Sequence, residues 1–349
     1  MKLYERIKEK QVYVIAEMSA NHGGNIENAY KIIEEAAKAG ADCVKIQTYT
    51  ADTLTIDCRK EAYLIKGGLW DGYNYYDLYK EAYTPWEWQA DLKRKCEEMG
   101  VDFLSTPFDT TSVDFLEDMG VEFYKIASFE MIDIPLVEYV ASKGKPIIMS
   151  VGMGSEEEIR EALDACMRQN NDQVILLKCC SQYPAQFEDM NLSVIPDMEK
   201  RFGVPVGLSD HSLGSLAPVI ATSLGAKVIE KHVRLDEDVE SADAGFSMTM
   251  KEFAKMVTDV RNTTTILGNP TYELTEHEKN NLPSRRSLVA VKPIKKGEVF
   301  TKDNIRSIRP AIGIKPKYMA ALLGKEAKKD YEFGDPITME EVEFCHSFL

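Results

Sequence analysis

The stretch FYKIASFE, Phe123 to Glu130, combines the two properties that decide the fold. Its first half is apolar enough for a strand buried on both faces, as in a parallel sheet covered by helices. The same stretch also carries Lys125, Ser128 and Glu130, which are costly to bury without partners. Strict alternation would place Lys125 on the opposite face from Ser128 and Glu130, so we expect the strand to end or bulge between them.

Other apolar segments along the chain repeat this pattern, each followed by a plausible amphipathic helix. Asn25 and Ser155 stand where helix N-caps belong. Eight apolar strands alternating with helices over roughly 230 residues fit a closed (β/α)8 TIM barrel better than an open sheet. The fold class is therefore predicted to be α/β. The other segments are VYVIAEM, DCVKIQTY, DFLSTPF, PIIMSVG, VILLKCC, PVGLSDH and KVIEKHV.

Polar side chains stand at or near the end of every predicted strand, where barrel enzymes carry their catalytic groups. Two lysines supply positive charge and several hydroxyls supply short donors, a set that suits a carboxylate or a phosphate. Satisfied core groups would not be expected at all of these strand ends. The strand-end residues are Glu17, Lys45, Gln47, Thr106, Lys125, Ser128, Glu130, Ser150, Ser181, Ser209, His211, Glu230 and His232.

Two of these residues are histidines from the last two strands, which are neighbours in a barrel. His211 and His232 can therefore share a divalent metal, with water and substrate in the remaining positions. A third histidine, His22, follows the first strand in the segment NHGG. It either faces the site or stabilises a turn, and its spacing favours neither alternative.

Composition limits the classes of function. A formal net charge of −15 argues against nucleic acid as the main partner. Residues 285–330 carry 13 Lys/Arg and 4 Asp/Glu, a charge of +9, which leaves −24 for the rest. This basic segment is either a solvated face or meets an acidic surface or an anionic substrate. Seven cysteines without C-x-x-C spacing indicate free thiols.

No apolar run is long enough to cross a bilayer, which argues against a membrane partner. The amino-terminal MKLYERIKEK lacks the apolar stretch of a secretory signal. We therefore expect a cytoplasmic protein.

Two regions lie outside the barrel pattern. The connection from about Thr50 to Pro85 is long and crowded with tyrosine and tryptophan, which either bind a sugar or form a small satellite core. After about Thr265 the chain becomes polar, and a tail of short β-like pieces follows, enough for a small module. We predict a barrel domain at residues 1–268, a linker at 269–284 and a β-rich module at 285–349.

Ordered motifs along nearly the whole chain resemble the sialic acid synthase family. They are AEMSANHGG, VKIQTY, STPF, YKIASFE, PIIMSVGM, GLSDHS and VIEKHV, and the tail IKKGEVFTKDNIRSIRP resembles that family's antifreeze-like SAF domain. LWDGYNYYDLYKEAYTPWEW and RRSL look most like the pseudaminic acid synthase branch.

The resemblance implies an activity. It is the condensation of phosphoenolpyruvate with 2,4-diacetamido-2,4,6-trideoxy-L-altrose to give pseudaminic acid and phosphate. Synthesis of N-acetylneuraminate or legionaminate from another N-acylated amino sugar is the alternative. The resemblance further implies a domain-exchanged homodimer, in which an SAF arginine, here Arg309, reaches the partner's barrel.

The resemblance also implies roles for individual residues. The family uses a divalent metal, commonly Mn²⁺ with Mg²⁺ or Co²⁺ as alternatives, held by residues that correspond to His211 and His232. Ser181 stands where the family has asparagine, so that contact is shorter. Phosphoenolpyruvate contacts correspond to Lys45, Thr106, Lys125, Ser128, Ser150 and Ser209, and sugar contacts to Glu17, Gln47, Tyr183 and Asp243.

The predicted catalytic group is Glu130, Lys125 and Glu17, with Glu130 activating the water that attacks C2 of the donor. Two rival hypotheses remain open. One is a Schiff-base aldolase with Lys45 or Lys125 as nucleophile. The other is a non-catalytic carbohydrate- or ice-binding protein built on the SAF-like tail, which leaves the strand-end groups unexplained.

Overall fold

The computed structural model describes residues 3–9, 12–237 and 239–342. The chain divides into two compact units, Met1–Gly268 and Asn269–Leu349, which are described separately below. The finer division of the second unit, into a linker at 269–284 and a module at 285–349, stays a prediction.

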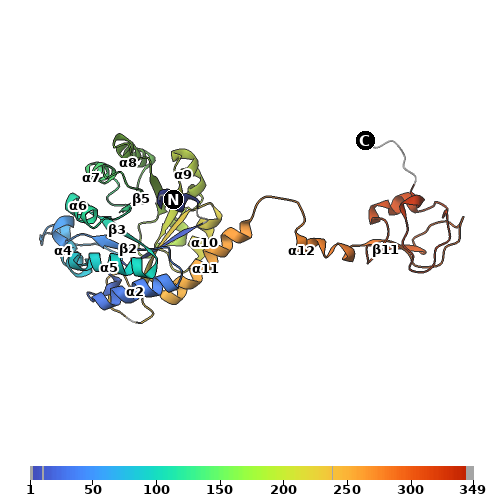
Figure 1. Ribbon diagram of the computed structural model, residues 1–349, viewed down its shortest axis with the longest axis horizontal. Helices are drawn as coiled ribbons and strands as arrows, with labels where there is room; N and C mark the ends of the chain where they lie inside the picture. Colours follow the sequence, from blue (N-terminus) through green and yellow to red (C-terminus); the bar gives the residue numbers. More distant parts are fainter. Residues whose placement is uncertain (1–2, 10–11, 238, 343–349) are drawn as a thin grey trace. The chain divides into compact units, whose positions relative to one another are not determined.

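Eight parallel strands of the first unit form a nearly closed barrel with helices around it (Figure 1). Paired neighbours run in the order β3-β2-β1-β8-β7-β6-β5-β4, and β3 lies next to β4 at the seam. The predicted TIM-barrel fold is confirmed. The strands are β1 Tyr13–Glu17, β2 Cys43–Thr48, β3 Asp102–Pro107, β4 Tyr124–Ile126, β5 Ile147–Ser150, β6 Val174–Cys179, β7 Val206–Asp210 and β8 Val228–Arg234, and a short β9, Met248–Thr249, pairs with β8.

Helices follow the strands and bury their apolar faces against the outside of the barrel. The predicted N-caps are confirmed: the Asn25 side chain accepts the N–H of Glu27, and Ser155 forms a capping box with Glu158. The barrel helices are α2 Ile26–Lys38, α5 Trp86–Met99, α6 Thr110–Asp118, α7 Ile134–Ala141, α8 Glu156–Arg168, α9 Val194–Phe202, α10 Leu216–Ser223 and α11 Met250–Leu267.

The two ends of the barrel interior differ in chemistry. Helix α1, Leu3–Glu9, packs Ile7 into a buried apolar cluster with inward residues of the strands, among them Ile15 and Leu104. At this end the Tyr13 hydroxyl donates to Asp102 at 2.5 Å, and these are the first residues of β1 and β3. The end at which the strands begin is therefore packed, and the polar residues gather where the strands end.

The long connection after β2 is more ordered than the expected loop. Its tyrosines form part of a satellite core, because Tyr79 packs edge to face on Tyr49 with ring centroids 5.9 Å apart. Trp70 instead packs on Tyr183, and the predicted use of these rings in sugar binding stays a prediction. The connection contains α3 Ala51–Leu54, the 3-10 turn Glu61–Tyr63 and α4 Tyr75–Ala82.

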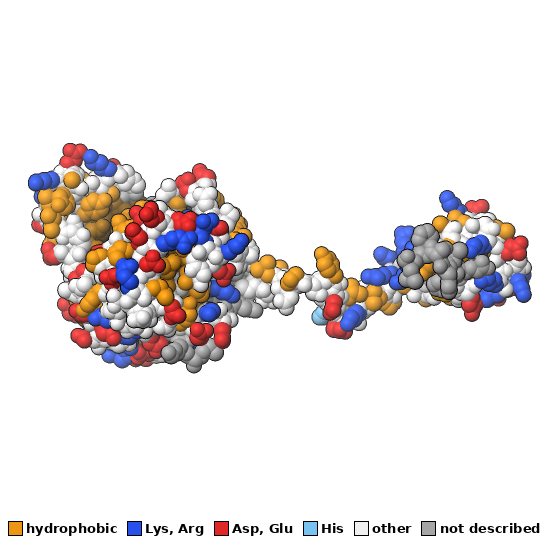
Figure 2. All heavy atoms as spheres, turned by 90° about the horizontal axis from the view of Figure 1, so that it is seen from above, with side chains coloured by type: hydrophobic (Ala, Val, Ile, Leu, Met, Phe, Trp, Pro, Cys, Tyr) orange, Lys and Arg blue, Asp and Glu red, His pale blue; other side chains and the backbone are white. Residues whose placement is uncertain are grey.

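The second unit is small and has its own core. Strands β10, Ser287–Ala290, and β11, Ile305–Ile308, pair antiparallel, and Leu288, Phe300 and Ile337 are among the residues buried beneath them. Lysine and arginine side chains form several groups on its visible face (Figure 2). The remaining helical pieces are short: α12 Glu276–Lys279 and α13 Met319–Leu322.

Two predictions concern the chain as a whole. Cys43, Cys58, Cys96, Cys166, Cys179 and Cys180 are free thiols, as expected, and Cys345 lies outside the described residues. Across the described part of the chain, no helix has the length and apolarity needed to cross a membrane.

Candidate active site

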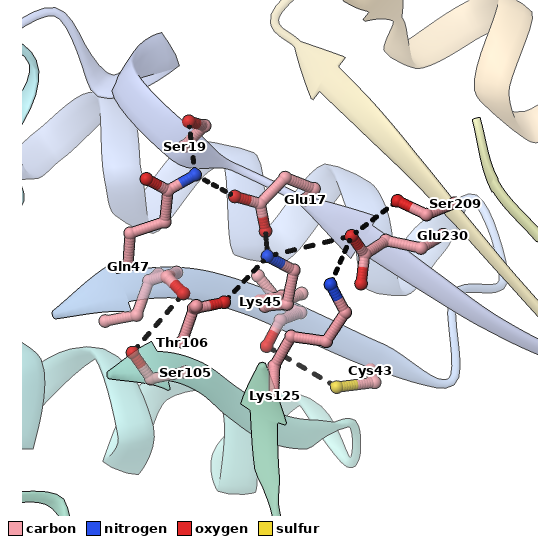
Figure 3. A network of polar contacts seen from close by, with 12 residues as sticks. Glu17, Ser19, Cys43, Lys45, Gln47, Ser105, Thr106, Lys125, Ser209 and Glu230 are labelled. Carbon is pink, nitrogen blue, oxygen red and sulfur yellow. Dashed lines mark hydrogen bonds and ion pairs between the residues drawn. The ribbon is translucent and has the colours of Figure 1, made fainter. Parts of the chain in front are cut away.

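Four buried charged side chains meet inside the barrel where the strands end (Figure 3). The Lys45 ammonium lies 2.8 Å from a carboxylate oxygen of Glu17 and 3.7 Å from one of Glu230. Lys125 lies 3.3 Å from the same Glu230 oxygen. None of the four residues is more than 3% exposed. The two lysines, predicted as a source of positive charge, are therefore already paired with carboxylates.

Burial and pairing shift the pKa values of this group in different directions. Burial alone would lower the pKa of Lys45, but the charges of Glu17 and Glu230 outweigh it and raise that pKa. Burial prevails at Lys125 and lowers its pKa, and burial raises the pKa of Glu17. The pKa of Glu230 falls because the two lysines overcome its burial. Lys45 is thus held firmly protonated, and Lys125 less so.

Two predicted hydroxyls extend this group. The Lys45 ammonium donates to Thr106 Oγ1 at 3.1 Å, and Ser209 Oγ donates to Glu230 Oε1 at 3.1 Å. Strands β1, β2, β3, β4, β7 and β8 therefore each contribute a side chain to one connected network. This arrangement confirms that strand ends distant in the sequence converge.

Gln47 and Asp243 lie on either side of Ser19. The Gln47 amide donates to Glu17 Oε1 and to Ser19 Oγ, both at 2.9 Å. The backbone N–H of Ala20 donates to Asp243 Oδ2 at 3.4 Å, and burial raises the pKa of Asp243. Both predicted sugar contacts thus lie beside the network, although Ser19 was not among the predicted site residues.

Two hydroxyl groups, one following β4 and one following β6, meet at a glycine that follows β5. The N–H of Gly152 donates to Ser128 Oγ at 2.9 Å. A Cβ on Gly152 would lie 2.3 Å from Ser181 Oγ and 2.9 Å from Ser128 Oγ, so the missing side chain lets these hydroxyls converge. Ser150 Oγ is buried and has no hydrogen-bond partner within the described residues, which leaves it available to a ligand.

Strand β4 ends at Ile126, as the alternation argument required. Ser128 and Glu130 lie in the turn that follows, where the N–H of Glu130 donates to Ala127 O at 3.1 Å. Burial raises the pKa of Glu130 to about 7. Its Oε2 atom is buried and makes no hydrogen bond to any residue that the structure describes. Such a carboxyl group can take up a proton near neutral pH.

The two predicted metal ligands face each other from neighbouring strands. The ring centroids of His211 and His232 are 5.2 Å apart. The Nδ1 atom of His211 lies 3.0 Å from the carbonyl oxygen of Cys180, which can only accept, so Nδ1 carries a proton. In the neutral imidazole, the lone pair is then on Nε2. Nδ1 of His232 is buried without a hydrogen-bond partner in the described chain.

These donors fit a divalent cation in part. The described residues contain no cluster of three or more His, Cys, Asp or Glu side chains able to hold an ion. His211 and His232 would therefore supply two nitrogen ligands and leave the remaining positions to oxygen atoms of substrate and water.

Aromatic side chains line the neighbourhood of the imidazoles. The Tyr183 ring lies 4.4 Å from that of His211, and the Phe246 ring lies 4.9 Å from that of His232. Trp70, from the long connection, packs on Tyr183 at 5.4 Å. The predicted sugar contact Tyr183 is therefore close to the imidazoles, while Trp70 and Phe246 were not predicted as site residues.

Arg309 and His22 are the two remaining candidates from the sequence. Arg309 is exposed in the second unit, directly after β11, and its predicted role at a barrel stays a prediction. His22 is buried edge to face against Trp88; its Nδ1 accepts the N–H of Gly24 at 3.0 Å, and its Nε2 lies 3.3 Å from Thr84 Oγ1. Of its two alternatives, the turn-stabilising one is confirmed.

The fold and this site define a barrel enzyme in which buried charges adjoin two imidazoles. Comparison with known proteins identifies the family. The model of the NeuB family matches residues 32–272, and that of the SAF domain matches residues 285–343. The chain belongs to the NeuB family and carries a SAF domain, which confirms the resemblance noted in the sequence.

Individual relatives cover almost the whole chain. A pseudaminic acid synthase from Campylobacter jejuni strain 81-176 is 47% identical over 329 residues, 94% of this chain and 96% of its own. An N,N'-diacetyllegionaminic acid synthase from Legionella pneumophila is 33% identical, over 95% of this chain and 94% of its own. The crystal structure of N-acetylneuraminic acid synthetase from Leptospira borgpetersenii matches with a TM-score of 0.69 and 33% identity, over 78% of this chain and 90% of that one.

Proposed function

We propose that the enzyme condenses phosphoenolpyruvate with 2,4-diacetamido-2,4,6-trideoxy-L-altrose and releases pseudaminic acid and phosphate. The higher identity to a relative named as a pseudaminic acid synthase than to one named for legionaminic acid supports this choice of product. The observation that carries the proposal is the buried group of Lys45, Lys125, Glu17 and Glu230 next to His211 and His232.

The donor occupies the lysine side of the pocket. Lys45 and Lys125 bind its phosphate and carboxylate through charge-assisted hydrogen bonds. The unpartnered Ser150 hydroxyl and the two hydroxyls gathered at Gly152 supply further donors without the cost of burying more charge. Thr106 and Ser209 keep Lys45 and Glu230 in place through the contacts described above.

His211 and His232 would hold a divalent cation beside the acceptor's aldehyde. Such a cation acts as a Lewis acid that polarises the aldehyde oxygen. The resemblance points to Mn²⁺, with Mg²⁺ and Co²⁺ as alternatives, and all three accept oxygen ligands from substrate and water. The hydrogen bond from His211 Nδ1 to Cys180 orients that imidazole before any ligand arrives.

Glu130 acts as the base for the hydration step. The electron pair of the donor's C2–C3 double bond forms the new bond from C3 to the aldehyde carbon, and positive charge develops at C2. The π pair of the aldehyde C=O bond moves onto its oxygen, which takes up a proton and becomes a hydroxyl. Water attacks C2 while Glu130 takes its proton, and the tetrahedral intermediate collapses to a ketone as the C2–O bond to phosphate breaks. A carboxyl pKa of about 7 suits this exchange near neutral pH. Glu17 and Gln47 orient the acceptor from the opposite side.

The domain-exchanged homodimer, with Arg309 at the partner's barrel, and the cytoplasmic location also stay proposals. The basic charge of residues 285–330 supports the first, since a cationic cap suits a site that holds anions.

A phosphate-release assay tests the activity directly. The purified enzyme is given phosphoenolpyruvate, Mn²⁺ and one of several acceptors: the L-altrose derivative, other diacetamido sugars or N-acetylmannosamine. We expect the highest kcat/KM with the L-altrose derivative. A higher kcat/KM with N-acetylmannosamine or another diacetamido sugar would favour the neuraminate or legionaminate alternative, and no release with any acceptor would overturn the proposal.

A further inference from the structure

The residues on either side of His211 bind the same lysine of the neighbouring strand. Asp210 is the last residue of β7, His211 follows it, and Ser212 comes next. The Lys231 ammonium lies 2.6 Å from Asp210 Oδ2 and donates a second hydrogen bond to the backbone oxygen of Ser212. The N–H of Ser212 in turn donates to Asp210 Oδ1 at 2.9 Å. His211 therefore lies between two residues that one ammonium group holds together.

The lysine that makes these contacts comes directly before the other histidine. Lys231 and His232 are consecutive residues of β8, and the parallel register pairs Lys231 with Asp210 across the two strands. Successive residues of a strand point to opposite faces, so Lys231 and Asp210 lie on the face that the helices cover. The imidazoles of His211 and His232 meet on the inner face, with ring centroids 5.2 Å apart. The ion pair is thus behind both histidines.

Burial makes this ion pair a costly way to join two strands. Asp210 and Lys231 are each 1% exposed. Removing two charges from water costs free energy that their attraction offsets only in good geometry, and an apolar pair of similar volume often stabilises a fold equally well. The strands are also paired through their backbones from Leu208 to Asp210. Stability alone therefore does not explain why the chain places charges here.

Other contacts orient the two imidazoles unequally. The bond from Nδ1 to Cys180 O orients the His211 ring, and the backbone oxygen of His211 accepts the N–H of Ala185 at 3.0 Å. Nδ1 of His232 is buried and has no hydrogen-bond partner among the described residues, so no bond at that atom orients the ring. Metal–ligand distances vary by only about 0.2 Å, so the binding of a shared cation depends on how the two backbones are held.

We propose that Lys231 is a positioning residue that holds His211 and His232 at the spacing needed to share one divalent cation. This inference rests on the metal role proposed for the two histidines. Lys231 itself touches neither the cation nor the substrates. Its ammonium fixes the residues before and after His211, and its place in β8 puts His232 next in the chain. Replacing partners of this kind, outside the ligands themselves, lowers metal affinity by roughly 10- to 100-fold.

Two variants separate positioning from stability. Lys231→Met leaves Asp210 buried without its cation, so both Tm and the affinity for Mn²⁺ should fall. Lys231→Met combined with Asp210→Asn removes both charges and keeps an amide oxygen for the N–H of Ser212, so Tm should recover in part. The bond to Ser212 O is still missing in this double variant. Its Kd for Mn²⁺ should therefore stay roughly 10- to 100-fold above the parent value.

The EPR signal of free Mn²⁺ measures this Kd for each full-length variant without any substrate, so the readout does not depend on turnover. A purely structural role would let affinity recover together with Tm. A Kd in the double variant equal to that of the parent would overturn the role of Lys231.

Val228→Ala is the matched control. Val228 is a buried residue at the start of β8, in the apolar cluster that includes Ile7. Its truncation leaves a cavity, so Tm should fall while the contacts of Lys231 stay in place. Its Kd for Mn²⁺ should remain within about twofold of the parent. If Val228→Ala loses as much affinity as Lys231→Met at an equal loss of Tm, affinity only follows stability and the proposal is overturned.

His232→Ala shows whether the measured ion occupies the proposed site. It should abolish the binding of Mn²⁺, because one of two nitrogen ligands is gone. A parent that binds no Mn²⁺, or binds it no better than His232→Ala, would overturn the metal role in the proposed function and this inference with it. Binding that depends on His232 but not on Lys231 would overturn this inference alone.

Discussion

Strands β7 and β8 contribute residues to two separate sets of buried charged side chains. The two sets differ in how completely their polar atoms are bound by the protein. Successive residues of a strand point to opposite faces, so Ser209 and Glu230 belong to the interior network while Asp210 and Lys231 lie on the other face. The Lys231 ammonium lies 2.6 Å from Asp210 Oδ2 and also donates to the backbone oxygen of Ser212. Asp210 Oδ1 accepts the N–H of Ser212 at 2.9 Å. Both charged groups of this pair therefore have partners within the protein.

The interior network is incomplete by comparison. Oε2 of Glu230, Oε2 of Glu130, Ser150 Oγ and Nδ1 of His232 are buried and lack hydrogen-bond partners among residues 3–9, 12–237 and 239–342. Unpartnered buried polar atoms are costly, and a native fold keeps them where a ligand completes the network. The difference teaches that burial of charge does not by itself mark a site. Unsatisfied atoms are several around the interior charges, whereas beside the Asp210–Lys231 pair Ser212 Oγ is the one that the described residues show.

Removing divalent metal should have the largest effect on the incomplete network. Treatment with EDTA should abolish phosphate release, because the aldehyde oxygen loses its Lewis acid, and added Mn²⁺ should restore it. The Asp210–Lys231 pair needs no ligand, so the far-UV circular dichroism spectrum should not change. Full activity in EDTA, together with borohydride trapping of substrate on Lys45 or Lys125, would instead establish the Schiff-base alternative.

Substitution of Glu130 should affect turnover almost as strongly. Glu130→Gln keeps the shape of the side chain but cannot take a proton, so kcat should fall by roughly 10²- to 10⁴-fold. The KM values should change little, because binding of the donor rests on the lysines. Glu157→Gln, an exposed change on α8, is the control and should leave kcat unaltered. Unchanged turnover in Glu130→Gln would remove Glu130 from the role of base.

Breaking each group of charges tests the comparison itself. Lys231→Met leaves Asp210 buried without its cation and should lower the free energy of unfolding by about 3–5 kcal/mol. Lys125→Met should cost less stability, because Glu230 keeps Lys45 at 3.7 Å, but it should raise the KM for phosphoenolpyruvate. Urea denaturation and steady-state kinetics measure the two effects. Equal destabilisation by both substitutions would show that the two groups do not differ as described.

The effect of pH on kcat should be the smallest of these effects. Burial raises the pKa of Glu130 to about 7, so the carboxyl is mostly protonated at pH 6 and mostly ionised at pH 8. Because the base acts in its ionised form, kcat should rise about tenfold between these pH values and then level off. Glu130→Gln should abolish the rise. A parent profile that is flat over this range would contradict the assignment.

The polar residues at the strand ends could be predicted because the spacing of apolar residues, which marks a buried strand, is a local property of the sequence. Lys45, Thr106, Lys125 and Ser209 were placed correctly at one end of a barrel by this argument alone. The pairing of both lysines with Glu230 was missed, although Glu230 stood at a predicted strand end and its charge could have suggested a partner.

Contacts made by loops could not be predicted from the sequence. The N–H of Ala20 donates to Asp243, and Trp70 meets Tyr183, over separations of more than a hundred residues. Periodicity fixes neither the path of a loop nor the partner of its side chains, because both depend on where the neighbouring loops pack. The left-handed conformation of Ser19 likewise follows from that packing, since its residue type gives no sign of it.

The balance of two lysines against two glutamates affects how the donor and the divalent ion bind in the barrel. A site whose charges already balance attracts a multiply charged anion only weakly. The donor therefore binds best when a cation binds together with it. A divalent ion on His211 and His232 is the nearest source of such a counter-charge. Binding of the donor should then raise the affinity for the ion, and binding of the ion should raise the affinity for the donor by the same factor.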